Sequence, residues 1–268
     1  MTSRFLLSAI AAAGLLCHAG AQAGWVTVSD SGSPVLSTCN PKSASGTQSA
    51  TLATCKITAL PSYAADGYIV ATSVPQRTTN ISVTGDTGTA VVGKLYERVW
   101  CHSTNGSTCD ATNKFIFGMR ANLNTTSTWN SDGETFEIND MFHAVPTGAT
   151  VEIAYFMGTV AGGTNVDTAQ ANKYLEYSGR TKKGLGEYAG SPSGLNPTRD
   201  NTWINFRADT NALDPDGISS PWSPWVFARL TCATGIDTVA HTSKLRLHEG
   251  GEEGQSDIEV LMSGYVCQ

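Results

Sequence analysis

The sequence predicts an all-β protein, an antiparallel β-sandwich or jelly roll held together by disulfides and carrying at most one short helix. Three observations support this prediction. Short β-branched and apolar runs recur along the chain, turn-forming residues separate them, and six cysteines follow a leader-like segment. A closed barrel satisfies the same pattern and stays open as an alternative.

The first 23 residues have the features of a signal peptide. Arg4 is the single charge before an apolar run from Phe5 to Leu16, and Ala21-Gln22-Ala23 supplies the small residues of a cleavage site. The run is about 12 residues long, whereas roughly 20 are needed to span a bilayer. We therefore expect residues 1–23 to be removed and residues 24–268 to form one secreted or periplasmic domain with no transmembrane segment. Lipidation at Cys17 is a less favoured alternative, because Leu16 stands where a small residue is required.

Charge excludes one class of partner. Without the leader the chain has 16 basic and 23 acidic residues, a net charge of −7. This balance repels phosphate backbones, so we expect no nucleic-acid partner. Charged residues make up only 15% of the chain and glycines number 27, a mixture that suits short strands joined by turns.

The cysteines predict a disulfide framework. An even number of them entering an oxidising compartment normally pairs completely. Sequential pairing keeps each bond within one local unit and is favoured over the other connectivities: Cys39 with Cys55, Cys101 with Cys109, and Cys232 with Cys267.

The N-terminal part of the mature chain shows the weakest strand signals. Residues 24–66 are rich in Ser, Thr, Ala and Gly, with strand candidates at Trp25–Val28 and Thr51–Ile57. We expect this stretch to form a loosely packed extension that the first disulfide stabilises.

Clearer strands follow at Tyr68–Val74, Asn80–Thr84, Val91–Trp100 and Lys114–Leu123. In the third of these, alternation predicts one face with Val91, Leu95, Val99 and Cys101, and an opposite face with Val92, Lys94, Tyr96, Arg98 and Trp100. The third and fourth strands should form a hairpin whose loop, with an Asn105-Gly106 turn, is closed by Cys101 and Cys109.

The remaining elements are shorter. Strands are predicted at Glu134–Ile138, Thr150–Thr159, Thr202–Ala208, Val226–Thr231, Lys244–His248 and Asp257–Val266. The last two flank an acidic glycine turn and should form a terminal hairpin. One helix is predicted at Thr168–Tyr177, capped by Asn165-Val166-Asp167 and stopped by Gly179.

One acidic string is the best metal candidate. Asp209, Asn211, Asp214 and Asp216 offer hard oxygen ligands close together, with Gly217 permitting a sharp turn, and such ligands suit Ca²⁺. The spacing is not that of an EF-hand. The alternative is a surface turn around Pro215 that binds nothing.

A second candidate is the segment from Ser220 to Trp225, with two tryptophans three residues apart between prolines. Extended backbone there would present the faces of Trp222 and Trp225 to sugar rings or to a partner chain. The alternative is that both indoles fill the edge of the core.

Other groups carry weaker expectations. The four histidines that follow the leader, His102, His143, His241 and His248, lack zinc spacing, and no nucleophile elbow is present. Carboxylates at Glu134, Glu137, Asp140 and Glu152 are candidates for an acid and base pair in one cleft, although side chains on the wet face of a sandwich look the same. Arg180–Gly184 is a basic loop that is solvated or contacts an anionic polymer. The loop Glu249–Asp257 is a solvated hairpin tip or a cation site.

No motif fixes a reaction, so function is a choice among classes. The favoured hypothesis is a non-catalytic secreted or cell-surface module that binds a glycan or cell-envelope polymer with calcium support. The alternatives are an extracellular polysaccharide hydrolase and a self-assembling surface or fibre subunit.

Overall fold

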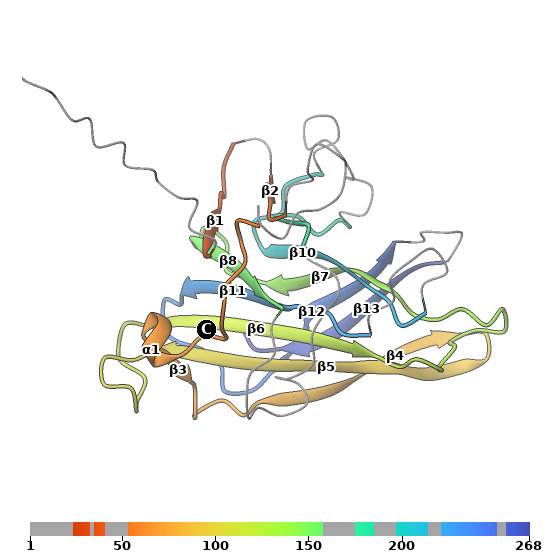
Figure 1. Cartoon of the computed structure of the whole chain (residues 1–268), viewed down its shortest axis with the longest axis horizontal. Helices are drawn as coiled ribbons and strands as arrows, with labels where there is room; N and C mark the ends of the chain where they lie inside the picture. The colour runs from red at the N-terminus through yellow and green to blue at the C-terminus, as the bar shows by residue number, and fades with distance from the viewer. Residues whose placement is uncertain are drawn as a thin grey trace, which may run out of the picture.

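The computed structural model describes residues 24–32, 35–40, 53–157, 175–184, 197–213, 221–250 and 256–268. Over these residues the protein is nearly all-β, with two antiparallel sheets packed as a sandwich-like pair of layers (Figure 1). The predicted fold class is therefore confirmed. The predicted signal peptide, residues 1–23, lies outside the described residues.

Sheet A has seven strands. In spatial order they are β1 (Val26–Val28), β8 (Val151–Phe156), β11 (Trp225–Thr231), β6 (Lys114–Leu123), β5 (Gly88–His102) and β3 (Tyr68–Val70), with β4 (Arg77–Gly85) also pairing with β5.

Sheet B has six strands. Their spatial order is β13 (Asp257–Gly264), β12 (His241–Gly250), β7 (Ile138–Ala144), β10 (Trp203–Thr210), β9 (Tyr177–Gly179) and β2 (Leu36–Thr38). The N-terminal segment thus contributes one short strand to each sheet. The predicted terminal hairpin is present, since β12 and β13 pair antiparallel from Leu245 opposite Met262 to Gly250 opposite Asp257.

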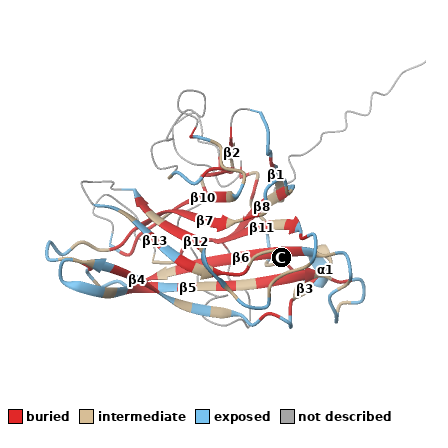
Figure 2. Ribbon diagram, turned by 180° about the vertical axis from the view of Figure 1, so that it is seen from behind, coloured by how far each residue is buried: buried red, intermediate tan, exposed pale blue. Residues whose placement is uncertain are grey.

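The main core lies between the sheets and is built by residues that alternate along each strand. Val226, Ala228 and Leu230 of β11 point into it, and Leu245 and Leu247 of β12 meet them from the other layer. Figure 2 shows burial concentrated in the central strands, whereas the far ends of β4 and β5 are exposed.

The alternation predicted for β5 is wrong at one end. Val91 is 42% exposed and Val92 is buried at 2%, the reverse of the expected faces. The cause is a register shift against β4, where Ile81 pairs with Gly93 but Ser82 pairs with Val91, so that one residue is extra on β5. Such a bulge inverts the alternation beyond it, which period-two reasoning cannot detect.

The single described helix is not the predicted one. α1 (Tyr63–Asp66) is capped at its start by Ser62, whose hydroxyl accepts a hydrogen bond from the Ala65 N–H at 3.3 Å. It is capped at its end by Gly67, which has a φ of 78°. The predicted helix at Thr168–Tyr177 falls mostly outside the described residues, and its last residue, Tyr177, lies in β9. The strand predicted at Glu134–Ile138 is displaced, because β7 begins only at Ile138.

Three disulfides form, with the sequential pairing that the spacing favours: Cys39–Cys55, Cys101–Cys109 and Cys232–Cys267. The second closes the β5–β6 hairpin as predicted, with Gly106 at φ of 73° in its loop. The third joins the end of β11 in sheet A to the residues after β13 in sheet B. It is therefore a bond between the two layers.

Within the described residues no helix has the length and apolar character needed to cross a membrane.

Candidate functional site

The outer face of sheet A carries the chemistry. Along β11 the residues that point away from the main core are Trp225, Phe227 and Arg229. The strand register places Arg229 opposite Glu152 of β8 on one side and opposite Ile116 of β6 on the other. Side chains from strands that are distant in sequence are thereby aligned in rows across the sheet.

A second apolar cluster occupies the middle of this face, with Trp100, Ile116, Trp225 and Phe227 as its centre. Trp100 packs edge-on against Trp225 and Phe227, at ring-centroid distances of 6.1 and 5.7 Å. Edge-to-face contacts of this kind add to the stability gained from burial alone. The outer face is thus a second core with polar side chains at its margins.

Gly118 is the position that allows this cluster to close. A Cβ atom there would lie 2.7 Å from Trp100 Cζ3 and 2.9 Å from Phe227 Cδ1, both on fully buried rings that cannot yield. We expect Gly118→Ala to lower the free energy of unfolding by about 1–3 kcal/mol through overpacking. Chemical denaturation measures this. Phe227→Leu should lower the free energy of unfolding less in the Gly118→Ala background than in wild type, because it relieves the overpacking. Equal losses in the two backgrounds would contradict overpacking as the cause.

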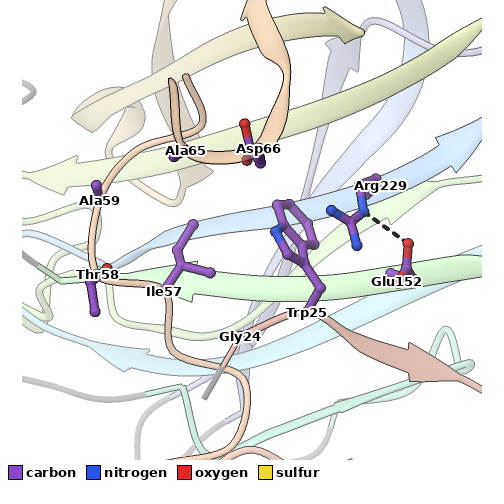
Figure 3. A pocket seen from close by; sticks show the side chains of 9 residues that line it. All are labelled: Gly24, Trp25, Ile57, Thr58, Ala59, Ala65, Asp66, Glu152 and Arg229. Atoms are coloured by element: carbon purple, nitrogen blue, oxygen red, sulfur yellow. Dashed lines mark hydrogen bonds and ion pairs between the residues drawn. The ribbon is translucent and has the colours of Figure 1, made fainter. Parts of the chain in front are cut away.

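A cleft of about 520 Å³ opens at one margin of the cluster. It lies between the β8–β11 surface, Trp25 just before β1, and the segment that runs from Ile57 through Ala59 to α1. Figure 3 shows Trp25 between Ile57 and Arg229, with the ion pair of Arg229 beside it. The cleft therefore combines an indole wall with groups of both charges.

Arg229 holds the cleft together. Its Nε donates to Glu152 Oε2 at 2.8 Å, and its guanidinium carbon lies 4.2 Å from the centroid of the Trp25 ring. A guanidinium stacked on an indole in this way fixes the orientation of both groups. The Trp25 ring is consequently held in place before any ligand arrives.

Asp66 of α1 is the second carboxylate of the cleft. Its Oδ1 accepts hydrogen bonds from the backbone N–H groups of Ser62 and Tyr68, at 3.1 and 3.3 Å. Burial raises its pKa, and the backbone hydrogen bonds, Arg229 and His102 oppose this rise. One oxygen of Asp66 is thus committed to shaping the cleft wall.

A second depression of about 350 Å³ adjoins the first and shares Glu152 and Arg229 with it. Its other lining residues are Tyr68, His102, Lys114, Thr150, Leu230 and Thr231. Burial raises the pKa of Tyr68 to about 12, with smaller contributions from neighbouring charges. The Tyr68 phenol therefore stays protonated near neutral pH.

His102 in this depression is paired with Asp110. The His102 Nδ1 and Asp110 Oδ2 atoms are 2.5 Å apart. Hydrogen bonds from Thr112 and from His102 lower the pKa of Asp110 to about 2. Asp110 is therefore ionised near neutral pH.

The tryptophan platform predicted at Trp222 and Trp225 needs correction. Trp225 is 1% exposed, packed in the outer cluster, and cannot offer its face to a ligand. Trp222 is half-buried, stacked on Tyr96 at 5.7 Å with the Arg120 guanidinium 4.6 Å from its ring centroid. The core-edge alternative describes Trp225 correctly, because alternation along β11 turns it towards Trp100.

Part of the predicted calcium string is described. Asp209 has a positive φ of 40° at the irregular end of β10, and Asn211 is 5% exposed. Asp214 and Asp216 lie outside the described residues. In the part of the chain that is described, no group of three acidic, histidine or cysteine side chains has a metal-binding arrangement.

Three other expectations are corrected by the layer structure. Glu137 and Asp140 belong to the sheet B side and Glu152 to sheet A, so these carboxylates do not share one cleft. In the loop Arg180–Gly184, Arg180 is buried and donates to the backbone carbonyls of Val28 and Asn201, whereas Lys182 and Lys183 are exposed as expected. Glu249 is likewise fully buried, at the end of β12.

Trp25, Asp66, Arg229 and Lys114 were missed as site residues. The sequence signal for this site was the alternation of Trp225, Phe227 and Arg229 along a predicted strand. This alternation indicates that one face of the strand carries two aromatic rings and a cation. Nothing local indicated that Trp25 would meet Arg229, because their contact depends on the order of strands in sheet A.

Comparison of the chain with protein-family models, curated proteins and solved structures found no match, so the fold and the site geometry are the basis for assigning function.

Proposed function

We propose that this protein is a secreted glycan-binding β-sandwich and that the Trp25 cleft is its binding site. The observation that carries the proposal is the Trp25 indole, half-buried and clamped by Arg229 at the wall of an open cleft. An indole face matches the apolar C–H face of a sugar ring. Arg229, Glu152 and Asp66 supply donors and acceptors for the hydroxyl groups at the ring edge.

The compartment supports this choice of ligand. Three disulfides are typical of proteins in oxidising spaces outside the cytoplasm, and glycans on cell surfaces are among the ligands present there. The signal peptide expected at residues 1–23 belongs to the same proposal. Calcium binding at Asp209, Asn211, Asp214 and Asp216 remains part of the hypothesis.

Replacing Trp25 with alanine should weaken binding to an insoluble polysaccharide about tenfold, which corresponds to roughly 1.4 kcal/mol. The loss comes from the removed stacking surface and from the released Arg229. The measurement is a depletion isotherm on a panel of insoluble polysaccharides and isolated cell envelopes, with Ca²⁺ or EDTA.

Two tryptophan controls sharpen the result. Trp203 in sheet B lies beneath a lysine ammonium, with Lys182 Nζ 5.6 Å from its ring, so Trp203→Ala removes a comparable cation–π pair elsewhere. Trp222→Ala tests whether Trp222, the half-buried member of the tryptophan pair predicted from the sequence, contributes to binding. If Trp25→Ala bound as tightly as Trp203→Ala, the cleft would not be the site, and loss only with Trp222→Ala would move the site to Trp222.

A further inference from the structure

The contact between His102 and Asp110 fixes the orientation and the tautomer of the imidazole. His102 Nδ1 faces Asp110 Oδ2 at 2.5 Å, while Asp110 Oδ1 accepts from the Thr112 N–H at 3.0 Å and the Thr112 hydroxyl at 2.5 Å. The carboxylate is thus held on both oxygens. A carboxylate that accepts from Nδ1 selects the tautomer in which Nε2 carries the lone pair.

The disulfide explains why this pair is rigid. His102 follows Cys101 and Asp110 follows Cys109, and these two cysteines are bonded. The Asp110 N–H also donates to the His102 carbonyl at 2.9 Å. The separation of the two side chains is therefore fixed by a covalent bond and a backbone hydrogen bond immediately beside them.

A glycine, Gly67, lies beside His102 Nε2. Within the described residues this atom has no hydrogen-bond partner. A Cβ on Gly67 would lie 3.3 Å from it, and Gly67 has a positive φ of 78°, at which side chains are strained. The absence of a side chain on Gly67 therefore leaves space beside Nε2, and His102, whose side chain is 28% exposed, lines the 350 Å³ depression.

The same depression contains two cations. Lys114 is exposed at the start of β6, and Arg229 lines both this depression and the Trp25 cleft. Permanent positive charges beside a basic imidazole are what a hydrolytic site needs to stabilise an oxyanion. The other charged or titratable groups around His102 are Asp66 of α1, Tyr68 of β3, Glu152 of β8 and Asp110 itself.

We propose that this depression hydrolyses a carboxylic ester carried by the glycan that the adjoining cleft binds, with His102 as the general base. The choice of a glycan ester rests on the proposed function, whereas the chemistry rests on the pair of His102 and Asp110. His102 contacts the attacking water and is the catalytic residue. Asp110 is a positioning residue.

The reaction balances with water as the only co-reactant. His102 Nε2 removes a proton as the water oxygen bonds to the ester carbonyl carbon, and the carbonyl π electrons move to oxygen, forming an oxyanion that Lys114 and Arg229 stabilise. The C–O bond to the alcohol then breaks. The departing oxygen takes the proton from the imidazolium, which gives a free sugar hydroxyl and a carboxylic acid that ionises in solvent.

The test is acetate release from an O-acetylated polysaccharide and from p-nitrophenyl acetate by the wild-type protein. We expect His102→Ala to lower kcat at least 100-fold on both substrates, in the range found for general-base catalysis. Asp110→Asn should lower kcat and change the pH–rate profile, and Asp110→Glu should restore part of the rate.

A matched control is present in the same chain. His241 Nε2 lies 2.6 Å from Asp237 Oδ2, an exposed pair that lines neither depression. His241→Ala should leave the rate unchanged. Wild-type protein that releases no acetate above the buffer rate, or equal rates for His102→Ala and His241→Ala, would overturn the proposal. Should His102→Ala not fold, as judged by its thermal unfolding, the same comparison is made with Asp110→Asn and Asp237→Asn.

The experiments test the binding proposal and the hydrolysis proposal independently. Trp25→Ala should raise KM for the polymer much more than KM for p-nitrophenyl acetate, because the small ester does not need the indole. Ester hydrolysis by a protein that binds no polysaccharide would reject the glycan site and keep the hydrolytic one. Polysaccharide binding without ester hydrolysis would do the reverse.

Discussion

Raising the pH from about 5.5 to about 8.5 should lower the free energy of unfolding by about 4 kcal/mol, because two buried glutamates are protonated in the folded protein. Burial raises the pKa of Glu249 from 4.5 to about 8, with further contributions from Glu137, Glu134 and Asp257. Burial likewise raises the pKa of Glu97 to about 7, against the effect of hydrogen bonds from Tyr265 and Arg77.

The sign follows from proton binding. Where the folded pKa lies above the unfolded one, the folded state holds a proton that the unfolded state has lost, so stability falls as pH rises between the two pKa values. For Glu97 this range runs from 4.5 to about 7, and for Glu249 from 4.5 to about 8. His143 acts in the opposite sense. Burial lowers its pKa from 6.5 to about 4, so its contribution is present above pH 6.5 and is lost as pH falls towards 4. The net decline is therefore steepest above pH 6.5.

Glu249→Gln should flatten this profile, because glutamine retains an acceptor for the Glu137 N–H, which lies 3.3 Å from Glu249 Oε2, and does not titrate. Urea denaturation at a series of pH values measures the slope. Glu259→Gln, on the neighbouring strand β13, controls for the change in net charge. A wild-type slope retained in Glu249→Gln would assign the pH dependence to other groups.

Removing the disulfide between Cys232 and Cys267 should lower the free energy of unfolding by about 4 kcal/mol, the largest effect expected of the three bonds. The residues it joins are 35 apart in sequence, so the bond removes more conformational freedom from the unfolded chain than the Cys101–Cys109 bond, with a separation of 8. For the shorter loop the same relation gives about 2–3 kcal/mol.

Both double serine variants can be compared by denaturant titration. The Cys232 and Cys267 bond connects the end of β11 in sheet A to the residues following β13 in sheet B, so its loss should also loosen the packing of the layers. Hydrogen exchange in β13 measures that loosening. A greater loss of stability from the shorter loop would show that native-state contacts, rather than loop length, set the effect.

Local patterns predicted the fold and failed where the register is irregular. The β5–β6 hairpin with its disulfide and the β12–β13 hairpin were predictable because strand alternation, turn residues and cysteine spacing all act over short distances. The faces of Val91 and Val92 were predicted the wrong way round, because a bulge in β5 reverses the alternation there. α1 was overlooked because its four residues carry no periodic apolar pattern and depend on Ser62 and Gly67 at their ends.

The candidate site was hardly predictable. His102 was singled out, but its partner Asp110 was not, although the Cys101–Cys109 bond brings them together. The sequence around Trp222 and Trp225 predicts an exposed pair of indoles, yet Trp225 is buried against Trp100 of β5 and against Phe227 of its own strand. Trp25, by contrast, is one indole in an unremarkable segment, and only its contact with Arg229 makes it a site residue.

The sequence by itself determined the all-β class, the hairpins and the pairing of the cysteines, since these follow from alternation, turn chemistry and short separations along the chain. The tertiary structure alone decided which side chains meet. The order of strands in sheet A places β1, β8 and β11 side by side and so assembles Trp25, Glu152 and Arg229. Burial then fixes which groups stay ionised. Both depend on contacts between residues far apart in the chain, and no local pattern encodes such contacts.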